Sequence, residues 1–100
     1  MKHHIKLFTA VLIMSLSTGV NATGRMTCDS GDQALWKTKD QLQSAIESDG
    51  WKVRKIKVDG GCYEVYGATP EGIRVEAYFD PLTLEKLLVA QRGKILFQKN

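Results

Sequence analysis

Residues 73–79 alternate strictly between apolar and other side chains, and this run constrains the fold more than any other part of the chain. Such alternation is typical of a β-strand with one face packed on a core and one face polar. The apolar set consists of Ile73, Val75, Ala77 and Phe79, and the other set of Arg74, Glu76 and Tyr78. A sheet buried on one side only is usually antiparallel, and the short segments between the strand-like runs also require antiparallel pairing.

Two further strand-like runs precede this strand. In residues 51–58 the apolar positions change parity between Val53 and Ile56, which indicates a β-bulge near Arg54 and Lys55. The Asp-Gly-Gly triplet at 59–61 is typical of a tight turn and connects this run to a second one over residues 62–67. We therefore expect at least three consecutive antiparallel strands.

A single short helix is predicted ahead of the strands, at about residues 39–48. Thr38 and Gln41 have the spacing of a capping box, in which each side chain bonds to the backbone of the other residue. Gly50 is placed to end the helix in a left-handed conformation. The apolar stripe expected to face the sheet consists of Leu42, Ala45 and Ile46.

Residues 82–92 are compatible with two structures. Asp80 could cap a second helix, with Pro81 at its first position and Gly93 as its stop. Alternatively, residues 80–83 form a turn, residues 87–91 a fourth strand, and residues 94–98 a fifth strand after a turn at Arg92-Gly93. Periodicity does not separate these alternatives, so the sheet is expected to have three to five strands.

Residues 1–22 have the features of a cleavable secretory signal peptide. A cationic start is followed by the apolar run 7–16 and by small residues before the expected cleavage site after Ala22. The apolar run is shorter than the roughly 20 residues of a membrane-spanning helix, and Arg25 is incompatible with a lipoprotein signal before Cys28. We expect export to the periplasm, no stable membrane anchor after cleavage, and a mature chain that starts at Thr23.

Removal of residues 1–22 leaves 78 residues with a net charge of +1 and no histidine. Such a charge argues against a nucleic-acid partner, which usually requires a marked basic excess. The lack of histidine excludes a histidine-based nucleophile or general base and a histidine-ligated zinc or haem. We therefore expect no metal, no cofactor and no enzymatic activity.

Cys28 and Cys62 are the only two cysteines, and in an oxidising compartment they are expected to form a disulfide. The bond would tie a polar N-terminal arm, residues 23–35, to the sheet of a domain at residues 36–100. A loop of about 35 residues corresponds to roughly 4 kcal/mol in the chain-entropy description of disulfide stabilisation.

Residues 36–89 resemble a PepSY domain, most of all the small exported proteins that consist of one such domain. The resemblance rests on the motif Y-E-V at 63–65 followed by V-E-x-Y-x-D-x-x-T at 75–83. It implies an α+β fold with one N-terminal helix across an antiparallel sheet, and a turn at residues 80–83 that leads into a further strand. Many members have glycine after the threonine, where this chain has Leu84, and a side chain resists the positive φ of such a turn.

The resemblance implies protease inhibition or another protein contact, so we expect a non-enzymatic periplasmic binding module whose partner is a periplasmic or envelope protein, with proteases as specific candidates. Tyr and Arg are common interface anchors, and the expected binding face is the polar face of the sheet. That face comprises Glu64, Tyr66, Arg74, Glu76 and Tyr78. The alternative is an anionic cell-envelope component bound by the Lys and Arg residues at positions 52, 54, 55 and 57. Because neighbouring side chains of a strand point to opposite faces, these four are not expected to form one patch.

Overall fold

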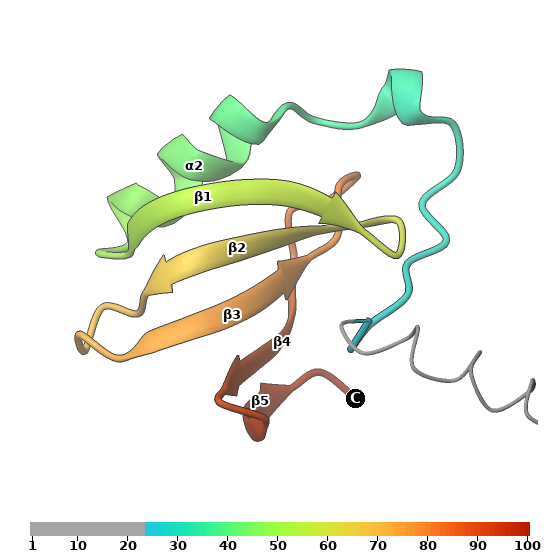
Figure 1. Ribbon diagram of the computed structural model, residues 1–100. Helices are drawn as coiled ribbons and strands as arrows, with labels where there is room; N and C mark the ends of the chain where they lie inside the picture. The colour runs from blue at the N-terminus through green and yellow to red at the C-terminus, as the bar shows by residue number, and fades with distance from the viewer. Residues whose placement is uncertain (1–23) are drawn as a thin grey trace, which may run out of the picture.

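A single helix lies across a five-stranded antiparallel sheet in the computed structural model, which describes residues 24–100 (Figure 1). Each strand pairs with the next one along the chain, so the order in the sheet is β1-β2-β3-β4-β5. The predicted α+β fold is confirmed, whereas the predicted signal peptide and Thr23 lie outside the described residues. The elements are the short 3-10 helix η2 (Gln33–Leu35), helix α2 (Lys39–Ser48), and strands β1 (Lys52–Asp59), β2 (Cys62–Ala68), β3 (Arg74–Phe79), β4 (Lys86–Gln91) and β5 (Lys94–Gln98).

Helix α2 begins and ends at the residues that the sequence indicates. The Thr38 hydroxyl accepts a bond from the Gln41 backbone N–H (3.0 Å), and the Gln41 side chain accepts one from the Thr38 N–H (2.7 Å). Gly50 follows the helix with a φ of 100°. Leu42 and Ile46 are buried as expected, but Ala45 is exposed, so the helix presents a narrower stripe to the sheet than predicted.

The predicted β-bulge and hairpin are both present in the first two strands. Val53 pairs with Gly67 and Lys55 with Tyr66, so Arg54 is the extra residue of β1. Gly60 and Gly61 connect β1 to β2 with φ values of 63° and 82°, and positive φ at both central residues is the geometry of a tight type I′ turn. The hairpin therefore follows directly from local sequence.

Residues 80–91 adopt the turn-and-strand alternative and not a second helix. The Leu82 N–H donates to the Asp80 carboxylate (2.8 Å), and the Leu84 N–H donates to the Asp80 carbonyl (2.7 Å). Leu84 has a φ of 66°, so the turn expected from the family resemblance forms although a leucine replaces the usual glycine. The Leu84 side chain packs against the core, and this burial offsets the backbone strain.

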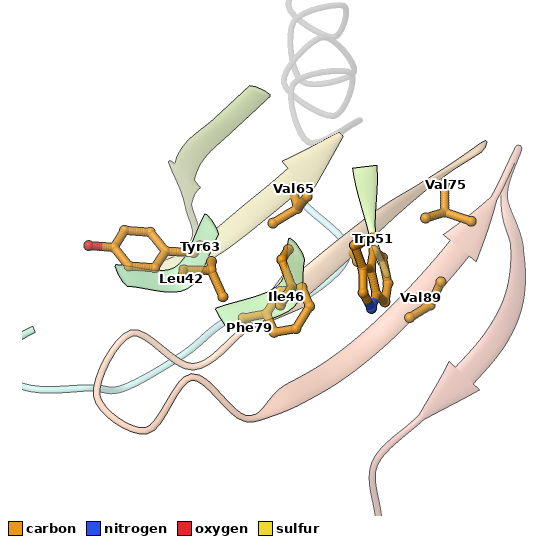
Figure 2. Packing of buried hydrophobic residues seen from close by; sticks show 9 residues of the cluster. Leu42, Ile46, Trp51, Tyr63, Val65, Val75, Phe79 and Val89 are labelled. Atoms are coloured by element: carbon orange, nitrogen blue, oxygen red, sulfur yellow. The ribbon is translucent and has the colours of Figure 1, made fainter. Parts of the chain in front are cut away.

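The main core fills the space between α2 and the sheet (Figure 2). Trp51 and Phe79 meet edge to face with ring centroids 5.8 Å apart. Ile73 is predicted to join this core, but it lies just before β3 and is 37% exposed. The core residues are Leu42, Ile46, Trp51, Tyr63, Val65, Val75, Ala77, Phe79 and Val89.

The N-terminal arm covers part of the opposite face of the sheet. It passes the end of the sheet where β1 turns into β2 (Figure 1), and the Cys28 N–H donates to the Gly60 carbonyl (2.8 Å). The predicted Cys28–Cys62 disulfide is present and attaches the arm to the start of β2. Met26, Cys28 and Leu87 pack against a second buried cluster, which consists of Cys62, Tyr78, Leu88 and Ala90.

Candidate binding surfaces

The expected binding face is divided by the N-terminal arm into a buried and an accessible part. Glu64 is 1% exposed and Tyr78 is fully buried, so the expectation that both face solvent is wrong. Alternation along β3 correctly separates the two faces of the strand, but it does not reveal that the arm lies over one of them. Tyr66, Arg74 and Glu76 remain accessible, and their role in binding stays a prediction.

The buried part is an internal polar cluster. The Tyr78 hydroxyl donates to the Asp59 carboxylate (3.0 Å), and burial together with this bond raises the pKa of Tyr78. Lys57 Nζ lies 3.9 Å from Glu64 Oε1, and this oxygen has no hydrogen-bond partner within residues 24–100. Burial raises the pKa of Glu64, although the hydroxyl groups of Tyr66 and Tyr78 lower it in part. Because the Glu64 and Tyr78 side chains are closed to solvent, these two residues serve the fold rather than a partner.

The accessible part is an open groove of about 560 Å³, which we call the arginine groove. The β-bulge contributes Arg54, the first residue of β3 contributes Arg74, and the β4–β5 turn contributes Arg92. Arg92 has a φ of 49°, a conformation that is uncommon for any residue other than glycine. The groove is lined by these three arginines and by Tyr66, Ile73, Val75, Glu76 and Gln91, with small residues between them.

The charge of the arginine groove is not neutralised by the protein. Its one carboxylate, on Glu76, already lies 3.5 Å from the guanidinium of Arg25. Within the part of the chain that the structure describes, Arg54, Arg74 and Arg92 have no carboxylate within 4 Å. Three unpaired guanidinium groups around one groove favour an anionic ligand, because each can form paired hydrogen bonds to a carboxylate or phosphate.

Two lysines of β1 extend this positive surface on the same side as Arg54. Lys55 and Lys57 both lie over the Tyr66 ring, with Nζ 5.4 and 5.5 Å from its centroid. The bulge at Arg54 shifts the parity of β1, so Val53 and Ile56 face the core while Arg54, Lys55 and Lys57 share the other side. Three of the four basic residues of this strand therefore share one side, which simple alternation does not predict.

A second surface, which sequence reasoning missed, lies on the helix side of the sheet near β5. Ile73, Leu96 and Phe97 are each 37–40% exposed and line a groove of about 310 Å³ with Trp51, Pro70 and Val89. We call it the β5 groove. Lys86 Nζ lies 4.2 Å from the centroid of the Phe97 ring at its rim. The run Ile-Leu-Phe at 95–97 was a possible signal, but a buried strand would have the same composition.

The two edges of the sheet differ in their protection. Strand β1 carries four Lys or Arg residues and a bulge, features that prevent a free edge from pairing with another chain. Strand β5 is the other edge. It also has a bulge, at Leu96, but its three central residues are apolar and exposed. An exposed apolar edge is typical of a site for strand addition.

Comparisons with known proteins give one match. The family PepSY_2, described as peptidase propeptide and YPEB domain, matches residues 4–88. No curated protein and no solved structure matches the chain. Among residues 24–100 there is no helix long and apolar enough to cross a membrane and no group of three potential metal ligands.

Proposed function

Because the chain belongs to the family of peptidase propeptide and YPEB domains, we propose that it is an exported, non-catalytic module that binds a peptidase and restrains its activity. The observation that carries the proposal is the exposed apolar edge at β5, beside the β5 groove. A surface of this kind would be a liability in a protein without a partner.

The mode of binding that this edge supports is strand addition. The backbone of β5 pairs with β4 on one side only, so its outer side is free to bond to an extended segment of a peptidase. Side chains of that segment would fill the β5 groove against Ile73, Leu96 and Phe97. Backbone bonds then supply general affinity, while the groove selects the side chains.

Export is supported by the features of the leader and by the disulfide. A pair of cysteines bonded across 34 residues is expected of a protein that reaches an oxidising compartment. We therefore place the proposed peptidase partner in the periplasm or envelope.

The proposal is tested by titrating residues 23–100 into the hydrolysis assay of a thermolysin-type metallopeptidase. We expect saturable inhibition, and we expect Leu96→Lys and Phe97→Ser each to weaken it at least tenfold without lowering the melting temperature by more than a few degrees. Val58→Ser is the matched control, because Val58 is 42% exposed on the opposite edge strand. Absence of inhibition, or equal loss in the Val58 variant, would contradict the proposal.

A further inference from the structure

We infer that the arginine groove binds an acidic peptide segment of the same partner that β5 receives, and this inference rests on the proposed function. The groove brings together three arginines that are distant in the sequence. Two unusual backbone features place them there: the bulge at Arg54 and the positive φ of Arg92. Glycine would fit the conformation of Arg92 better, so the arginine side chain itself accounts for the choice of residue.

The spacing of the arginines fits carboxylates along an extended chain. Strands β1 and β3 are separated by β2, so at a strand spacing of roughly 4.8 Å the backbones that carry Arg54 and Arg74 are roughly 10 Å apart. In a peptide in the polyproline II conformation, with three residues per turn and a rise of about 3.1 Å, side chains three residues apart point the same way and are roughly 9 Å apart. Two acidic residues at that interval could therefore each meet one guanidinium group.

The lining of the groove favours a peptide over a polymer of phosphates. Ile73 and the Tyr66 ring contribute apolar surface between the arginines, which a phosphate polymer would leave in contact with water. Ile73 also lines the β5 groove, so the two grooves meet at the end of the sheet where β3 begins. One segment with both carboxylate and apolar side chains could occupy both.

The direct test measures binding of fluorescein-labelled nonapeptides by anisotropy at low salt. The probe is three repeats of Glu-Gly-Leu, and the neutral control has Gln in place of each Glu. We expect the Glu peptide to bind at least tenfold more tightly, and Arg54→Ala, Arg74→Ala and Arg92→Ala each to weaken it about five- to tenfold. Lys39→Ala is the matched control, since it removes the same charge at the N-terminus of α2 and should leave binding unchanged.

Several outcomes would overturn the inference. Equal binding of the two peptides, or equal weakening by Lys39→Ala, would leave only a general effect of charge. Inorganic tripolyphosphate is also tested as a competitor of the Glu peptide. If it displaces the peptide at concentrations below that of the peptide, and if this displacement also requires the three arginines, the groove is assigned to a phosphate anion. The peptidase assay separates the two proposals: if the triple arginine variant inhibits as well as the wild type while Phe97→Ser does not, the acidic-segment inference fails and the proposed function stands.

Discussion

Glu64 shows how a single residue can have the opposite role from the one its type suggests. Its side chain is buried on the strand pair beside Tyr78 with one oxygen unbonded among residues 24–100, and burial raises its pKa above the ordinary value of 4.5. At pH values between 4.5 and the raised pKa of Glu64 in the folded state, the folded state binds more protons than the unfolded state. The free energy of unfolding should therefore fall as pH rises through this interval.

We expect Glu64→Gln to increase stability at pH 7 by on the order of 1 kcal/mol, because it removes a buried charge. The gain should shrink as pH falls through the raised pKa of Glu64, because the wild-type carboxyl group then becomes protonated in the folded state. Urea unfolding at several pH values measures this difference. Glu85→Gln is the control, because Glu85 pairs with Lys99 at the surface and should show little change. A Glu64 variant that is less stable at pH 7 would indicate that the contact with Lys57 outweighs the burial.

Leu84 combines a strained backbone with a useful side chain. A left-handed conformation costs an ordinary residue about 1–2 kcal/mol, and here contact with the core offsets that cost. We expect Leu84→Gly to be more stable than Leu84→Ala by about 1 kcal/mol, because both lose the packing but only alanine keeps the strain. Leu82 lies in the same turn and has no positive φ, so its alanine variant should be more stable than its glycine variant, as is usual. Thermal unfolding of the four variants decides it; the usual order at position 84 would mean that the turn is not left-handed there.

At the level of elements, the sequence correctly predicted the features that depend on residues close together in the chain. The capping box of α2, the bulge at Arg54 and the Gly60-Gly61 turn each depend on a few adjacent residues, and all three are present. The choice between helix and strand after Pro81 could not be made in this way, because pairing with β3 decides it. The covered face and the β5 groove also depend on contacts between distant segments, which periodicity does not record.

Loss of a buried side chain should lower the free energy of unfolding on either face of β3, because both faces are covered at Val75 and Tyr78. Alternation alone predicts that Tyr78→Ala costs much less than Val75→Ala, but Tyr78 is fully buried under the arm. We now expect Tyr78→Ala to cost about 3–5 kcal/mol and Val75→Ala about 1–3 kcal/mol, since large buried side chains leave large cavities. Arg74→Ala, on an exposed side chain, should change stability by less than about 0.5 kcal/mol. Chemical denaturation of the three variants would contradict this account if Tyr78→Ala behaved like Arg74→Ala.

The arm is the element whose position depends most on one covalent bond. Apart from the disulfide, it is held by the packing of Met26, by the ion pair of Arg25 with Glu76, and by single hydrogen bonds such as Ser30 Oγ to the Asp80 carboxylate (3.2 Å). We expect reduction to lower the free energy of unfolding by about 2–4 kcal/mol and to speed amide exchange in residues 25–30. A variant with alanine at both Cys28 and Cys62 should be as unstable and insensitive to reductant. Unchanged stability after reduction would show that the non-covalent contacts suffice.

At the scale of the whole molecule, a small domain uses both faces of one sheet for its core. Helix α2 covers the side that carries Val65 and Ala77, while the disulfide-bound arm covers Cys62 and Tyr78. What remains uncovered is the arginine groove on one side and the β5 groove on the other, and they meet at Ile73. Both candidate surfaces thus lie beside the areas that α2 and the arm cover, and the arm reaches the arginine groove only through the pair of Arg25 with Glu76.

The proposed export and the fold are linked, because the arm is fixed by a bond that forms under oxidising conditions. We expect the protein expressed with its leader in a bacterial host to be recovered from the periplasm with Thr23 as its first residue and no free thiol. Intact mass spectrometry with and without alkylation measures both properties at once. Ala22→Leu places a large residue at the cleavage site and should retain residues 1–22. Retention of the leader in the wild type, or free thiols at Cys28 and Cys62 after cleavage, would contradict the proposed export and leave the position of the arm without its covalent support.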